Sequence, residues 1–72
     1  MIIPKNELIK IASDVLKCEI TMDSDMNNTD TWDSLAHLEL IMAVEEWFNT
    51  NFDTKKISTL TSMEAILDEL EK

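Results

Sequence analysis

Residues 33–48 read DSLAHLELIMAVEEWF, and this stretch decides the fold. It contains no Pro or Gly, and its apolar residues recur at three- and four-residue spacing, which predicts a helix. Asp33 or Ser34 can cap the helix, since either side-chain oxygen can accept a hydrogen bond from a free backbone N–H group. We expect the helix to run to about Asn49, which makes it about 24 Å long.

This predicted helix carries two stripes of side chains. The first is apolar throughout and is expected to face the core; it consists of Leu38, Ile41, Val44 and Phe48, widened by Leu40. The second alternates apolar and acidic side chains; it consists of Leu35, Glu39, Met42 and Glu46. Because acidic side chains are rarely buried in a core, we expect the second stripe to bind a partner protein.

Trp47 lies one step round the helix from the second stripe. We expect its ring to pack on the core beside Phe48, because aromatic residues at helical spacing usually pack inward. The alternative is a partly exposed ring that anchors a partner, a role in which Trp is common.

The sequence predicts further helices on both sides. Upstream, apolar residues at helical spacing predict a helix over about residues 4–17, with Pro4 in its first turn. Residues 18–32 are rich in Asp, Asn, Ser and Thr, which predicts a long loop. We expect three apolar side chains to pin this loop onto the helices: Ile20, Met22 and Met26.

Downstream, residues 52–57 favour a short helix capped by Asp53. Thr61 and Glu64 then have the spacing of a capping box, which predicts a last helix ending near Glu71. Its apolar stripe consists of Met63, Ile66, Leu67 and Leu70. The expected fold is all-α: a small four-helix bundle, with three main helices plus one short helix and a long first loop, in a single domain over residues 1–72.

The composition agrees with this fold class and argues against several functions. The 72 residues include no Gly and one Pro, too few for a many-stranded β fold, and 44% are hydrophobic, too many for intrinsic disorder. The net charge of −9, with six Lys and fifteen acidic residues, disfavours nucleic-acid binding and favours a partner with a basic surface. No apolar run approaches the length that inserts into a membrane. The single Cys18, and a start at Met1–Lys5 unlike a secretory signal, favour the reducing cytoplasm.

Two arrangements suggest other chemistry but lack its requirements. Asp23, Asp25 and Asn27 place oxygen atoms at alternate positions, as in a calcium-binding loop. However, Asn28 stands where the sharp turn needs Gly, and Ser34 stands where a bidentate Glu is needed. We therefore expect a solvated polar loop and no metal site.

Cys18 and His37 suggest a nucleophile and its base, but the chain offers no strained Gly-rich turn and no oxyanion donors beside them. We expect Cys18 to be a packing residue and His37 to have a structural or surface role. No catalytic residue is predicted, and the chain is not expected to be an enzyme.

The whole stretch from Asp33 to Phe48 resembles the signature of acyl carrier proteins, and the expected order of helices resembles that family over the whole chain. The resemblance implies that Ser34 carries a 4′-phosphopantetheine arm, transferred from coenzyme A, whose thiol holds an acyl or aminoacyl group as a thioester. It also implies that Asp33 and Leu35 are read by the phosphopantetheinyl transferase. Glu39, Met42 and Glu46 match the family's partner-facing helix, and Trp47 lies beside them.

The resemblance further implies a monomer that meets acyl-loading and acyl-using enzymes through their basic surfaces. The sequence departs from the fatty-acid synthesis members of the family at several positions: Thr31 and Trp32 precede the Asp-Ser pair, Ala36 and Trp47 replace common acids, and Lys55 and Lys56 add positive charge. These departures favour a stand-alone carrier for a specialised pathway, such as one for a modified fatty acid, a polyketide or an activated amino acid. The rival from another class is a non-covalent acidic adaptor in which Ser34 is only a helix cap.

Overall fold

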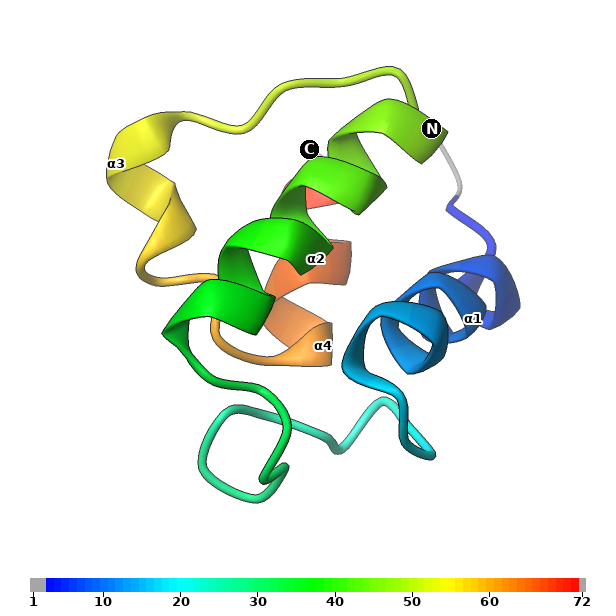
Figure 1. Cartoon of the computed structure of the whole chain (residues 1–72). Coiled ribbons are helices and arrows are strands. Elements are labelled where there is room, and N and C mark those ends of the chain that lie inside the picture. The colour runs from blue at the N-terminus through cyan, green and yellow to red at the C-terminus, as the bar shows by residue number, and fades with distance from the viewer. Residues whose placement is uncertain (1–2, 72) are drawn as a thin grey trace.

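Four helices make up most of the described part of the chain, residues 3–71, in the computed structural model. They are α1 (Lys5–Leu16), α2 (Ser34–Trp47), α3 (Thr54–Ile57) and α4 (Met63–Leu70). Figure 1 shows α2 in the middle, with α1 on one side, α3 on the other and α4 behind. No β-strand occurs in residues 3–71, which confirms the predicted all-α bundle of three main helices and one short helix. Met1 and Ile2, on which the expectation about the start of the chain partly rests, lie outside the described residues, as does Lys72.

The core is a single cluster to which each of the three longer helices contributes one face. The buried side chains from these helices are Leu8, Ala12 and Leu16 of α1, Leu40, Ile41 and Val44 of α2, and Met63, Ile66 and Leu67 of α4. The long first loop packs on this cluster, as predicted: Ile20 is buried, and Met22, Met26 and Cys18 are partly buried against the core. The loop therefore has fixed neighbours although it contains no helix.

The helix ends differ slightly from those predicted. Pro4 is the N-cap of α1 and has an extended backbone, so the helix begins one residue later than predicted. Lys17 ends α1 in the left-handed region, with φ of 57°. α2 ends at Trp47, two residues before the predicted Asn49, because Asn49 is also left-handed, with φ of 51°. Asn accepts this conformation more readily than most residues, which suits it to a helix end.

The predicted cap of α3 is confirmed, and the predicted capping box of α4 is wrong. Asp53 caps α3 by accepting a hydrogen bond of 2.9 Å from Lys55 N. α4 is capped by Ser62, whose Oγ accepts from Ala65 N at 3.1 Å. Thr61 lies outside the helix, where its carbonyl accepts from Met26 N at 3.0 Å, beside a bridge between Asp25 and Ser62. The cap of α4 is therefore one residue later than predicted, and Thr61 contacts the long loop instead.

The core-facing side of α2 is rotated from the predicted one. Ile41, Val44 and Leu40 are buried as expected, and Phe48 is partly buried. Leu38, predicted to face the core, is 52% exposed. His37, for which we expected a structural or surface role, takes the inward position and is only 6% exposed. The prediction for Leu38 is therefore wrong, and His37 has the structural role.

His37 is buried because both of its ring nitrogens have partners. Trp32 Nε1 donates to His37 Nδ1 at 3.0 Å, and the two rings stack with centroids 6.1 Å apart. His37 Nε2 lies 2.7 Å from the carbonyl oxygen of Ile57. Because Nδ1 accepts the indole proton, Nε2 carries the imidazole proton and donates it to that carbonyl. One neutral side chain thus joins the end of the long loop, α2 and the end of α3.

We expect Trp32→Phe to lower the free energy of unfolding by about 2 kcal/mol or more, because it leaves the buried Nδ1 of His37 without a donor and leaves space in the core. The measurement is urea unfolding followed by circular dichroism. Trp47→Phe is the matched control, since the same change at an exposed ring should stay within about 0.5 kcal/mol. Equal losses in the two variants would contradict the structural role of the Trp32–His37 bond.

Candidate functional site

Ser34 is the first residue of α2 and is exposed. Asp33, and not Ser34, is the N-cap: Asp33 Oδ1 accepts from Ala36 N at 2.8 Å, and its carbonyl oxygen accepts from His37 N at 2.8 Å. The hydroxyl of Ser34 makes no hydrogen bond within residues 3–71. The helix is therefore capped without Ser34, and the Ser34 hydroxyl holds no backbone group in place.

The backbone around Ser34 favours a negative charge. The geometry of an α-helix leaves the N–H groups of Ser34 and Leu35 without intrahelical acceptors, and the helix dipole is positive at this end. The carboxylate of Asp33 accepts from Ala36 N and so leaves the N–H groups of Ser34 and Leu35 free. An anionic ester on Ser34 would thus meet free donors beside it.

A hollow of about 630 Å³ opens beside Ser34, between α2, α3 and the long loop. Its lining consists of Met26, Ser34, His37, Leu38, Thr54, Ile57, Ser58 and Thr61. Three of these side chains are apolar and four carry hydroxyl groups, so the walls suit a small or medium apolar group with a few polar atoms. The sequence analysis missed this hollow, although Thr54 and Ser58, four residues apart, lie on one face at α3.

The structure does not bring Cys18 and His37 together. His37 lines the hollow beside Ser34 with both ring nitrogens engaged, while Cys18 lines a different hollow, formed by the long loop. There, Cys18 Sγ lies 3.3 Å from Thr31 Oγ1. No nucleophile and base pair forms from these two residues.

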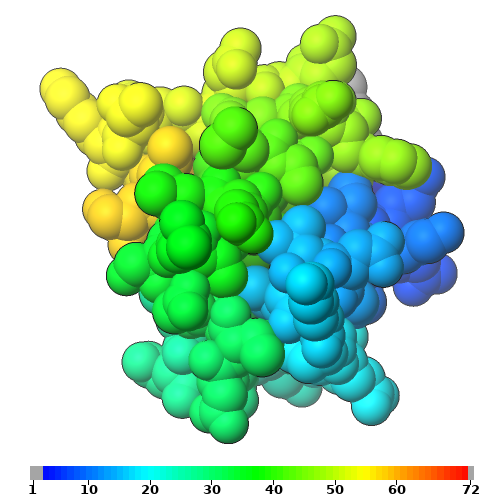
Figure 2. All heavy atoms as spheres, in the orientation of Figure 1, coloured from blue at the N-terminus to red at the C-terminus, as the bar shows by residue number. Residues whose placement is uncertain are grey.

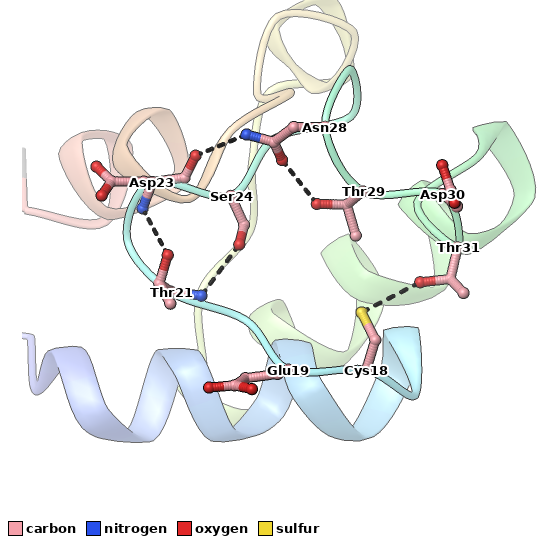
Figure 3. A pocket seen from close by; sticks show the side chains of 9 residues that line it. All are labelled: Cys18, Glu19, Thr21, Asp23, Ser24, Asn28, Thr29, Asp30 and Thr31. Carbon is pink, nitrogen blue, oxygen red and sulfur yellow. Dashed lines mark hydrogen bonds between the residues drawn. The ribbon is translucent and has the colours of Figure 1, made fainter.

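The side chains of the long loop support its own turns. Asp25 Oδ1 accepts from the backbone N–H groups of Asn27 and Asn28 at 2.8 and 2.9 Å, and Asn28 Nδ2 donates to the carbonyl oxygen of Asp23. Figure 3 shows the hollow formed by the long loop, in which the carboxylates of Glu19, Asp23 and Asp30 do not converge on one point. No cluster of three or more His, Cys, Asp or Glu side chains suited to a metal ion occurs in residues 3–71.

The second stripe of α2 lies at the surface, as predicted. Leu35 and Met42 are 69% and 67% exposed, and Glu39 and Glu46 are exposed beside them. Figure 2 shows side chains of α2, in green, across the middle of the face in view. Leu38 adds to the apolar part of this surface because the helix is rotated. We use the term outer face of α2 for these five residues.

Trp47 is 61% exposed, so the expectation that it packs in the core is wrong. Val44 in the last turn of α2 and Phe48 just after it already pack on the core, and Trp47 lines a surface hollow together with residues of α1. The structure agrees with the alternative expectation that the Trp47 ring is partly exposed.

Comparison with protein-family models and with curated proteins found no match to this chain. None of the helices in the part of the chain that the structure describes is long and apolar enough to cross a membrane.

We expect Asp33→Ala to lower the free energy of unfolding by about 1 kcal/mol, because it removes the oxygen that caps α2. Ser34→Ala should change it by less than about 0.5 kcal/mol, since the exposed hydroxyl holds no backbone group. Urea unfolding of the two variants beside the parent chain measures the difference. A larger loss in Ser34→Ala than in Asp33→Ala would show that the cap is wrongly assigned.

Proposed function

We propose that this chain is a non-catalytic carrier whose Ser34 bears a 4′-phosphopantetheine arm through a phosphodiester. The observation that carries the proposal is the exposed, unpaired hydroxyl of Ser34 at the start of the longest helix, capped by its neighbour Asp33. When bound, the arm supplies a thiol that holds an acyl or aminoacyl group as a thioester.

The residues around Ser34 fit such a group. The Ser34 hydroxyl is the atom that forms the ester bond, and the free N–H groups of Ser34 and Leu35 favour the negative charge of the phosphate. Leu38, Ile57 and Met26 offer an apolar wall next to the attachment point. In this proposal the chain holds and presents its cargo, and the chemistry belongs to the enzymes that dock on it.

The outer face of α2 supplies the docking surface in this proposal. Its exposed apolar side chains would be buried in an interface, which favours binding. Glu39 and Glu46 attract a basic surface. The partners are the phosphopantetheinyl transferase, which meets Asp33 and Leu35, and the enzymes that load and use the acyl group. We propose a monomer that works in the cytoplasm, as a single domain serving a specialised pathway.

A non-covalent adaptor is the second candidate, because the same exposed outer face of α2 suits it. It makes no use of the Ser34 hydroxyl. Modification of Ser34 therefore separates the two functions in one measurement.

We expect incubation with coenzyme A and a phosphopantetheinyl transferase to add one arm to the chain, detected by intact mass. Ser34→Ala should abolish the addition while the circular dichroism spectrum keeps its helical form, because Asp33 still caps α2. Ser58→Ala is the matched control, since Ser58 lines the same hollow and should leave the addition unchanged.

An unmodified parent chain under conditions that modify a known carrier would refute the carrier function and leave the adaptor. Addition to Ser34→Ala would refute the attachment site.

We expect Glu39→Lys with Glu46→Lys to slow modification of Ser34 by about tenfold at low salt, because reversed charges repel a basic enzyme surface and lower the association rate. The loss should shrink as salt rises. The measurement is kcat/KM for the transferase across a salt series. Glu64→Lys, which changes the charge of an exposed residue on α4, is the control and should have a smaller effect. Equal effects of all these changes would place the docking surface elsewhere.

A further inference from the structure

A second hollow, of about 510 Å³, lies between α1 and α2. Its lining consists of Ile11, Asp14, Val15, Ala43, Glu46 and Trp47. Trp47 is about 120° round α2 from Leu35, so the hollow opens on a different side of the helix from most of the outer face. It is also about 20 Å along α2 from Ser34, at the opposite end of the helix.

The hollow combines an exposed aromatic ring with two unpaired negative charges. Trp47 exposes most of its indole, the largest exposed apolar side chain of residues 3–71. The carboxylates of Asp14 and Glu46 make no hydrogen bond or ion pair within the described residues, and no basic residue is part of the lining. Such a surface attracts cations, because the face of an indole is negative and carboxylates are near it.

We propose that this hollow binds an arginine side chain of a basic partner protein. The guanidinium group would stack on the indole of Trp47 and donate hydrogen bonds to Asp14 and Glu46. Its aliphatic stem would lie over the apolar part of the lining. Arginine fits better than lysine, because a planar group with five donors can stack and bind two carboxylates at once.

A second copy of this chain is not the occupant. The chain contains no Arg, and its net charge of −9 makes two copies repel each other. The partner therefore supplies the cation, and its charge is opposite to that of this chain. The proposal does not depend on any group on Ser34, so the unmodified chain tests it separately from the carrier function.

The test is a titration of the ¹⁵N-labelled chain at low salt with the peptide acetyl-Leu-Arg-Leu-amide, followed by NMR. The indole N–H signal of Trp47 should shift, while that of the buried Trp32 should not. The same peptide with citrulline in place of Arg keeps the planar shape, but it lacks the charge and has a carbonyl oxygen in place of one NH2 donor group, and it should bind several-fold more weakly.

Two variants assign the contacts. Trp47→Leu, read at the amide of Ala43, should weaken binding by about threefold, because it keeps an apolar surface and removes the ring face. Asp14→Asn with Glu46→Gln should weaken it by about fivefold. Glu64→Gln, an exposed carboxylate that lines a different hollow on α4, is the matched control and should leave binding unchanged.

Equal binding of the arginine and citrulline peptides would overturn the proposal. An unchanged indole N–H signal of Trp47 would also overturn it. So would a loss of affinity in Glu64→Gln equal to that in the Asp14→Asn, Glu46→Gln double variant. All of the residues changed are exposed or at the edge of the core, so the variants should keep the fold, which circular dichroism checks.

Discussion

The hydrogen-bonded chain from the Trp32 indole through His37 to the Ile57 carbonyl is the interaction on which the rest of the structure depends. It joins the end of the long loop to α2, five residues further along the chain, and α2 to the end of α3, twenty residues beyond His37. A buried imidazole with two fixed partners helps to set the rotation of α2, because turning the helix would leave both ring nitrogens unpaired. That rotation turns Leu38 outward and places Ser34 at the edge of a hollow.

At the start of α2, Asp33 caps the helix and Ser34 does not. Asp33 uses its side chain and its carbonyl to satisfy the N–H groups of Ala36 and His37. Ser34 is exposed at the start of α2, and its side chain does not support the helix. A reactive hydroxyl that also capped the helix would weaken the helix when modified, because the modification would remove its hydrogen bond. In the proposed function, Ser34 would carry the attached group, while its neighbour Asp33 caps the helix.

The sequence predicted the features that depend on interactions between residues near each other in the chain. The helices α1, α2 and α4 and the cap at Asp53 depend on residues close together in the chain, and the structure confirms them. Of the two candidate caps of α2, Asp33 and Ser34, the structure shows Asp33. Two of the errors depend on contacts between separate segments. The His37 ring, which takes the inward position in place of Leu38, is held by Ile57 twenty residues away, and the carbonyl of Thr61 accepts from Met26 of the long loop. The error at Trp47 has a nearer cause, because Val44 and Phe48 already contribute inward side chains at that end of α2. Ser34, the proposed attachment site, stands in a motif that the sequence shows, but the hollow beside it combines the long loop, α2 and α3, and no local pattern marks it.

The distribution of charge explains how so much apolar surface can stay exposed. Leu35, Leu38, Met42 and Trp47 all lie on α2, a combination that usually leads copies of a protein to associate. Carboxylates are interspersed with these side chains at Glu39 and Glu46, and the whole chain carries a net charge of −9. Two copies therefore repel before their apolar surfaces can meet, whereas a basic surface is attracted from a distance and then gains the apolar contact. In the proposed function the same acidic groups would oppose self-association and favour a basic partner, so the composition of the chain bears directly on the surface it presents.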